Sequence, residues 1–432
     1  MPKRLFRDFD HTLAFLSVSK ALENKWRRRD VVSFIEEWTG RSRLELARDE
    51  LERGALSYGL KYEILDELAL TVEDMVGDIV RGIDPDFDPV RNQLRPDGNT
   101  GKIRNIALLC IRHQILGHVV KLGIEPLLRA RLLPTQHASI PEKGQTGLAR
   151  QVKRMLNRKL GIQYAIKTDC TGAYASVQYS VITDIFRKEI PRARWIFPCM
   201  RILERYAPGG HLIIGGYLDA WLFNFVMSYA LRYVLTLNKS RRGNRVPLVI
   251  RAVTFMDDLL LLGRNRRALL VAVERLKEWM FDNFGMSLHA TTDPLRIFSI
   301  EEEKARKHRH GAGRGCPAVD MGGYLIHRTY ITLRKRNAPK IIRCFDRAWA
   351  EYKRTGTIKR QRACQIIARN GMVKNSNSFI LSEKHHAAEL MRVARRVQGY
   401  WSREANRKRK EYIFNVIAKH EINVRALSCF DG

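Results

Sequence analysis

The chain has 432 residues, of which 45% are hydrophobic, and its 77 Lys and Arg outnumber 45 Asp and Glu to give a net charge of +32 at pH 7. This length and apolar content exclude a disordered tail and allow two or three subdomains around a large core. The basic excess favours a polyanionic partner, and since no basic amphipathic helix stands out it does not indicate a membrane surface.

The cysteines and the N-terminus bear on the compartment. The cysteines are odd in number and never spaced Cys-x2-Cys, which argues against a zinc site and a disulfide framework. They are Cys110, Cys170, Cys199, Cys316, Cys344, Cys364 and Cys429. Charges interrupt residues 1–20, so no signal peptide is predicted, and no apolar run approaches a membrane span. Free thiols are typical of a reducing compartment. We therefore expect a cytoplasmic protein with no membrane partner.

Residues 1–95 are predicted to be helical. Apolar residues recur at helical spacing over 31–38 and again over 62–76. The acidic, proline-containing segment 84–90 ends this region. We expect a helical extension packed on the rest of the protein, and nothing in it indicates a particular chemistry.

A turn at 96–99 precedes a predicted strand that contains Lys102 and Arg104. Alternation along a strand places these two cations on one face. There they suit a triphosphate, the Arg through its planar fork and the Lys as a point charge, although surface charge is the simpler explanation of such a pair in isolation. After a core helix, Gly144 and Gly147 in the segment 137–147 permit close approach of the backbone to a ligand.

Two further segments carry candidate site residues. Over 162–177 a strand-like run ends at Asp169, and Tyr174 follows five residues later. Asp169 by itself would fit a turn or a helix cap. Residues 209–234 begin with a Gly-Gly turn and continue as a strongly apolar helix.

Residues 249–263 are predicted to form a β-hairpin, because two apolar runs flank Asp257-Asp258. Two adjacent carboxylates beside hydrophobic strands are costly unless a positive charge lies against them. A divalent metal ion most often supplies that positive charge. A pair of metal ions needs a third carboxylate from another strand, such as Asp169. A solvated Asp-Asp turn is the alternative for the hairpin taken alone.

Together, these segments resemble reverse transcriptase motifs in the order that the family has them. Asp169 with Tyr174 resembles motif A, Asp-x4-Phe/Tyr. The run from Phe255 to Asp258 resembles motif C, an aromatic-x-Asp-Asp hairpin in which the family more often has Tyr. Motif B is matched by Gly215, Gly216, Tyr217 and Asn224. Asp219 and Ala220 stand where the family has Ser-Gln, which puts a mutagenic, diversity-generating role in doubt.

Weaker matches flank these motifs. The segment 137–156 resembles the family's Ala-Ser-Ile-Pro-Gly-Lys-Gly-Gln stretch, with Glu142 in place of Gly. Residues 321–324 resemble motif E, Phe-Leu-Gly-Tyr, and residues 368–378 resemble a thumb helix, with Asn375 in place of His. The resemblance implies an α+β right-hand polymerase: a helical N-terminal extension at 1–95, fingers and a palm with an antiparallel sheet at 96–330, and a basic helical thumb and C-terminal extension at 331–432.

The resemblance also implies the site. Asp169 and Asp257 would hold two Mg²⁺ ions, Asp258 would assist, and the backbone carbonyl of Cys170 would complete the coordination. One metal would activate the primer 3′-hydroxyl and the other would neutralise the triphosphate of the dNTP substrate. The implied nucleotide-binding residues are Lys102, Arg104, Tyr174 as a steric gate, and Gly216. The implied template and primer contacts are Gly144, Gln145, Gly215, Tyr217, Asn224, Gly322, Gly323 and Lys374.

The implied function is RNA-directed DNA synthesis. Its expected partners are an RNA template, in particular a structured non-coding RNA, and an RNA–DNA hybrid; self-association stays open. No maturase, endonuclease or RNase H signature is visible, and with the loss of Ser-Gln this favours the bacterial enzymes that act in phage defence. The alternatives are a diversity-generating enzyme, a template-independent or protein-primed DNA polymerase, and a non-catalytic RNA-binding scaffold. The template, the primer and the product are not predicted.

Overall fold

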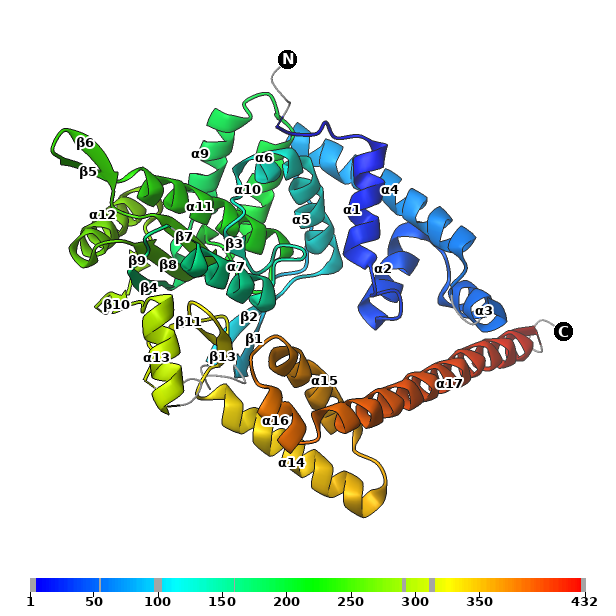
Figure 1. Ribbon diagram of the computed structural model, residues 1–432. Helices are drawn as coiled ribbons and strands as arrows, with labels where there is room; N and C mark the ends of the chain where they lie inside the picture. Colours follow the sequence, from blue (N-terminus) through cyan, green and yellow to red (C-terminus); the bar gives the residue numbers. More distant parts are fainter. Residues whose placement is uncertain are drawn as a thin grey trace. The chain divides into compact units, whose positions relative to one another are not determined.

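The computed structural model describes residues 5–53, 56–96, 103–158, 160–289, 293–310 and 315–428 (Figure 1). The chain forms two compact units. The first comprises Met1–Arg131, Val177–Phe223 and Glu404–Gly432, and the second comprises Leu132–Ser176 and Asn224–Arg403. Each unit combines stretches that are far apart in the sequence, so the two units do not correspond to consecutive domains. The domain boundaries predicted after residues 95 and 330 therefore stay a prediction.

The first unit begins with the helices predicted from the apolar spacing. They are α1 (His11–Leu22), α2 (Arg29–Thr39), α3 (Arg43–Arg53) and α4 (Tyr58–Arg81). Side chains cap two of them, since Asp10 accepts from the backbone N–H of Leu13 and Ser57 from that of Leu60. Helices therefore form this region as far as Arg81, whereas residues 91–96 form a strand and not part of the predicted helical region.

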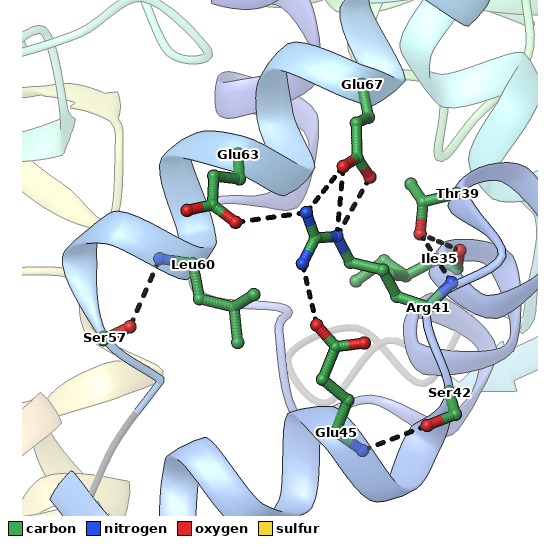
Figure 2. Close-up of polar contacts among 9 residues, drawn as sticks. All are labelled: Ile35, Thr39, Arg41, Ser42, Glu45, Ser57, Leu60, Glu63 and Glu67. Carbon is green, nitrogen blue, oxygen red and sulfur yellow. Dashed lines mark hydrogen bonds and ion pairs between the residues drawn. The ribbon is translucent and has the colours of Figure 1, made fainter.

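One arginine links three of these helices, as Figure 2 shows. Arg41, between α2 and α3, donates from Nη1 to Glu45 of α3 at 2.8 Å. Its Nη2 donates to Glu63 at 3.1 Å and to Glu67 at 2.6 Å, and both acceptors lie on α4. The Arg41 side chain is only 19% exposed. It therefore acts as a shared counter-charge for three carboxylates that would otherwise repel one another.

The remainder of the first unit contains a two-stranded ribbon and a helical layer. Strands β1 (Arg91–Pro96) and β2 (Ile103–Leu108) pair antiparallel, so the strand predicted around Arg104 is present. Lys102 lies outside the described residues. The helical elements are α5 (Ile111–Gly123), α6 (Glu125–Arg131), α9 (Tyr179–Glu189), α10 (Ile196–Tyr206), the 3-10 turn η1 (Pro208–Gly210) and the start of α11 (Tyr217–Thr236).

The second unit is built on a mixed sheet with the order β10-β4-β8-β7-β3, in which β9 also pairs with β4. Its pairs are antiparallel except β3 with β7. The strands are β3 (Gln136–His137), β4 (Tyr164–Thr171), β7 (Arg251–Phe255), β8 (Asp258–Gly263), β9 (Ser287–Leu288) and β10 (Leu295–Arg296). Every residue from Leu259 to Gly263 is buried, so β8 is a central strand.

Helices and smaller sheets surround this sheet. They are α7 (Gln145–Asn157), α8 (Ala173–Ser176), α12 (Arg266–Phe284), α13 (Ile300–His310), the hairpin β5 (Asn238–Arg241) with β6 (Asn244–Pro247), and a sheet of β11 (Val319–Met321), β12 (Tyr324–Ile326) and β13 (Ile331–Leu333). The chain continues through α14 (Asn337–Thr355), α15 (Arg360–Lys374), α16 (Phe379–Lys384) and α17 (Ala387–Ser428).

A network of hydrogen bonds holds the approach to β4. Arg328, in the turn after β12, donates to the carbonyls of Phe298 and Ile162, each at 2.7 Å, and to that of Leu156 at the end of α7. Glu303, which is 1% exposed, accepts from the backbone N–H of Arg328 at 2.7 Å. Ile162 lies two residues before β4, so this network fixes where β4 enters the sheet.

The cysteines that fall within the described ranges are free thiols. In the part of the chain that the structure describes, no helix is long and apolar enough to cross a bilayer.

Replacing Arg41 with Met is expected to lower the free energy of unfolding by about 1–3 kcal/mol, because three glutamates lose their common counter-charge. The loss should shrink as salt screens the remaining repulsion. Thermal unfolding at low and high salt measures it, with Arg48→Met on the exposed face of α3 as the matched control. Equal unfolding temperatures for the two variants at low salt would contradict the assigned role of Arg41.

Candidate active site

The hairpin predicted around the two aspartates is present, with a correction to its turn. Strands β7 and β8 pair so that Phe255 faces Asp258. The two-residue turn is therefore Met256-Asp257, and Asp258 is already the first residue of β8. Met256 has φ of 55°, in the left-handed region that a methionine rarely adopts. A strained backbone conformation thus lies directly beside the paired carboxylates.

The neighbouring strand brings the third carboxylate to this turn. In the antiparallel pair of β4 and β8, Asp169 lies directly opposite Asp258. The backbone N–H of Cys170 donates to the carbonyl of Asp257 at 3.1 Å. Burial raises the pKa of the Cys170 thiol, and the charges of Asp257, Asp169 and Asp258 raise it further. All three aspartates therefore lie close to one buried thiol.

The carboxylates differ in their neighbours. Lys167, two residues before Asp169 on β4, places its Nζ 2.7 Å from Oδ1 of Asp258 across the strand pair. His289 follows β9, and its Nε2 lies 3.7 Å from Oδ2 of Asp169. The Asp169 side chain is 49% exposed and that of Asp258 is 27% exposed. Lys167 thus neutralises Asp258, while the carboxylate of Asp169 stays accessible to a ligand from solvent.

The donor chemistry at this turn suits a hard cation, because carboxylate oxygens are the ligands that Mg²⁺ prefers. Among the residues that the structure describes, no three His, Cys, Asp or Glu side chains are arranged to hold a metal. The side chains at this turn therefore fit Mg²⁺ by type but are not arranged around a metal, and the metal-binding roles of Asp169, Cys170, Asp257 and Asp258 stay predictions.

Asn224 ties the hairpin to the preceding loop. Its Nδ2 donates to the carbonyl of Ala138 at 3.2 Å and lies 3.8 Å from the Sδ of Met256. Gln136 of β3 donates to the Asn224 carbonyl at 2.7 Å, and the backbone N–H of Met256 donates to the carbonyl of His137 at 3.3 Å. Asn224 is fully buried. We therefore expect it to act on a template through the loop that it holds and not by direct contact.

The loop before α7 is strained. Ala138, Ser139 and Glu142 have φ of 69°, 53° and 64°. Glu142 stands where the resembling family has Gly, and its left-handed backbone is the conformation that Gly adopts most easily. Gly144 caps α7, and a Cβ on it would meet nothing within 4 Å. Gly144 and Gln145 are exposed, so both are accessible to a ligand.

Three other predicted contact sites lie elsewhere in the second unit. Gly322 and Gly323 form the turn between β11 and β12 with φ of 58° and 85°, and a Cβ on either would meet a side chain at 2.8 or 2.9 Å. Tyr174 on α8 is half-buried. Lys374 is exposed and ends α15.

The remaining predicted residues belong to the first unit. Arg104 is exposed on β2. Gly215 has φ of 114°, and a Cβ on it would lie 2.6 Å from the carbonyl oxygen of Ala107 on β2. The neighbouring carbonyl of Ile214 accepts from the backbone N–H of Ala107 at 2.8 Å. Tyr217 stacks on His118 with ring centroids 3.9 Å apart and is 40% exposed.

Asp219 is a residue whose role sequence reasoning missed. Its Oδ1 accepts from the backbone N–H of Ile213 at 2.8 Å and from the Tyr179 hydroxyl at 3.0 Å. A Cβ on Gly216 would lie 1.7 Å from Oδ2. Burial raises the pKa of Asp219 to about 6 against these two hydrogen bonds, which lower it. The sequence offered one clue to this role, because Asp replaces the Ser of motif B at position 219. In the structure the Asp219 carboxylate holds the loop 213–216 in place.

Comparison with known proteins identifies a domain within the chain. Residues 93–291 match the family described as "Reverse transcriptase (RNA-dependent DNA polymerase)". No curated protein matches. The predicted enzyme class is therefore confirmed over this range.

Two solved structures show a distant likeness. Apo telomerase from Candida tropicalis is 11% identical, with 94% of this chain and 78% of that chain covered and a TM-score of 0.41. The structure of apo telomerase from Candida tropicalis truncated from the C-terminal domain is 9% identical and has a TM-score of 0.36. The match covers 62% of this chain and 60% of that chain. This chain thus spans 60% of that truncated chain, and TM-scores this low add no argument.

Replacing Glu142 with Gly is expected to raise the free energy of unfolding by roughly 0.5–1 kcal/mol, since Gly relieves the left-handed strain at some entropic cost. Glu142→Ala removes the same carboxylate but keeps Cβ, so it should give no such gain. Denaturant unfolding compares the two variants. An equal gain for both would show that charge, and not backbone strain, is responsible.

Replacing Asp219 with Asn is expected to change how stability depends on pH. Because the folded-state pKa of about 6 lies above the ordinary value of 3.8, the stability linked to this proton is present below pH 3.8 and is lost as pH rises through 6. Asn is neutral throughout, so the Asn variant should gain on the wild type by roughly 2 kcal/mol between pH 4 and pH 7. Unfolding measured across that window tests this, and a pH-independent difference would contradict it.

Proposed function

We propose that this chain, whose residues 93–291 form a reverse transcriptase (RNA-dependent DNA polymerase) domain, copies RNA into DNA at Asp169, Asp257 and Asp258. The observation that carries the proposal is the pairing of Asp169 with Asp258 across β4 and β8, with Asp257 in the adjoining turn. These carboxylates lie inside the range that matches the family. The chemistry of these side chains and the range of the family match therefore both support the proposal.

Each group of residues has a defined task in this proposal. Asp169 and Asp257 bind the cations, and Lys167 holds Asp258 beside them at 2.7 Å. Mg²⁺ supplies, when bound, a lowered pKa for the primer 3′-hydroxyl and neutralisation of the triphosphate. Arg104 binds the triphosphate of the incoming dNTP, aided by Lys102. Tyr174 occupies the space of a ribose 2′-hydroxyl and selects deoxynucleotides.

The template and primer are held by the flanking turns and helices. The exposed residues Gly144 and Gln145 face the template, and the turn Gly322-Gly323 grips the primer end. Lys374 contacts phosphates of the RNA–DNA hybrid. Gly215, Gly216 and Tyr217 support the nucleotide and the templating base. The net charge of +32 supports a polyanionic partner of this kind, whose binding weakens as salt rises.

We assign the chain a biological role in bacterial phage defence, with a structured non-coding RNA as template. The support is the motif B departure: Asp219 and Ala220 replace Ser-Gln, and Asp219 is committed to the loop 213–216 by two hydrogen bonds. A polymerase without the Ser-Gln pair is expected to copy one dedicated RNA template and not to introduce mutations during copying. Phage challenge of bacteria that carry the gene tests the role, and the absence of protection together with an adjacent variable repeat would overturn it.

Replacing Asp257 with Asn is expected to lower primer extension on an RNA template by more than roughly 100-fold, because loss of even an outer-shell partner of a metal site costs 10–100-fold. Asp169→Asn should act alike. Asp282→Asn, an exposed aspartate on α12, is the matched control and should keep wild-type activity. Wild-type extension by a variant that lacks Asp169, Asp257 and Asp258 together would refute the proposal.

A further inference from the structure

Helices α14 and α15 line an open cavity of about 430 Å³ that lies outside the range matching the polymerase family. Its described lining contains no Asp or Glu. The lining includes six cationic side chains: Lys340, Arg343, Arg347, Lys359, Arg362 and Arg369. A concave site with one sign of charge focuses the electrostatic potential and raises the local concentration of an anion.

Polar contacts hold two of these arginines in place. Arg369 of α15 donates from Nη1 to the carbonyl of Lys340 on α14 at 2.8 Å, which ties the two helices together at the cavity. Arg362 places its Nε 2.5 Å from Oε2 of Glu351, whose Oε1 accepts from the backbone N–H of Lys359 at 2.8 Å. Glu351 is therefore engaged by the start of α15. The guanidinium groups are preorganised, which lowers the entropic cost of binding a ligand.

Three of the other cations line the cavity from exposed positions. Arg343 and Arg347 lie one turn apart on α14, and Lys359 precedes the first turn of α15; all three are exposed. Residues four apart lie on the same helix face, so Arg343 and Arg347 point to the same side. Like charges placed this way repel one another, and an anion bound between them would offset that repulsion.

The number and convergence of the cations indicate the class of ligand. A nucleic-acid backbone carries one charge per phosphate, spread along the strand, and is matched by cations strung along a surface. Here the cations surround a single hollow, which suits several phosphates concentrated in one group. Arginine forks bind phosphate oxygens through two parallel hydrogen bonds, and the exposed Gln361 at the cavity supplies a further donor.

We propose that the α14–α15 cavity binds a triphosphate group, presented either by the 5′ end of an RNA or by a free nucleoside triphosphate. This site is separate from the aspartate turn and does not depend on the proposed polymerase activity. A chain that handles RNA would gain from it the ability to distinguish a triphosphorylated transcript end from other RNA. The ligand is recognised by its charge density and not by its sequence.

The test is equilibrium binding of the full chain to one RNA oligonucleotide with either a 5′-triphosphate or a 5′-hydroxyl, at one salt concentration. The triphosphate RNA is expected to bind at least about tenfold more tightly, since charge-assisted hydrogen bonds are the strong ones. The double variant Arg343→Gln/Arg347→Gln should reduce this ratio to near one. Competition by ATP that is lost in the double variant would assign the site to free nucleotide, and preference for the RNA end without such competition would assign it to RNA.

The matched control is Arg354→Gln/Lys384→Gln, which removes the same charge from exposed positions of α14 and α16 that do not line the cavity. It should keep the wild-type ratio, and unfolding curves should show that both double variants are folded. Equal binding of the two RNAs by the wild type, together with no competition by ATP, would overturn the proposal. So would a ratio that falls equally in both double variants. Primer extension is measured separately, so the failure of either proposal is distinguishable from that of the other.

Discussion

The pairing of β4 with β8 is the constraint on which the candidate active site depends. Its register places Asp169 opposite Asp258 and leaves Asp257 in the turn. Because side chains alternate across a strand, a slip of one residue would send Asp169 to the other face of the sheet. The buried run from Leu259 to Leu262 opposes that slip, since a shift along the strand would carry Asp258 into the core or a leucine out into the turn. The hydrophobic core thus fixes where the charges lie.

The groups around the Met256-Asp257 turn restrain its backbone and leave the Asp169 carboxylate accessible to solvent. Lys167 offsets Asp258, the strained Met256 shapes the turn, and Asn224 fastens the turn to the loop before α7. In the first unit, Asp219 and the carbonyl of Ile214 fix the glycine loop against β2 in a similar way. The net basic charge is unevenly distributed, because residues 1–95 hold 19 Asp and Glu against 16 Lys and Arg. The polyanion-binding surfaces are therefore expected beyond the helical N-terminal region.

Local patterns in the sequence predict the parts of the fold that local chemistry determines. The helices of the N-terminal region follow from apolar spacing, and the hairpin follows from two apolar runs around Asp257. The turn is Met256-Asp257 and not the predicted Asp257-Asp258, because the apolar runs on either side do not determine which two residues lie outside the strand pairing. The diagonal contact of Lys167 with Asp258 and the clamp made by Asp219 depend on tertiary packing that no local pattern encodes. The cavity between α14 and α15 was likewise invisible, since its six cations come from two helices and their connection and look like ordinary surface charge in the sequence.

The most direct test of the central claim is to locate the metal itself. Crystals of the chain soaked in Mn²⁺, a substitute for Mg²⁺ with an anomalous X-ray signal, would show where divalent ions bind. The account predicts anomalous density between the carboxylates of Asp169 and Asp257, which disappears when both are replaced by Asn. Density only at other carboxylates, or an Asp169 side chain that points away from the turn in the presence of Mn²⁺, would contradict it.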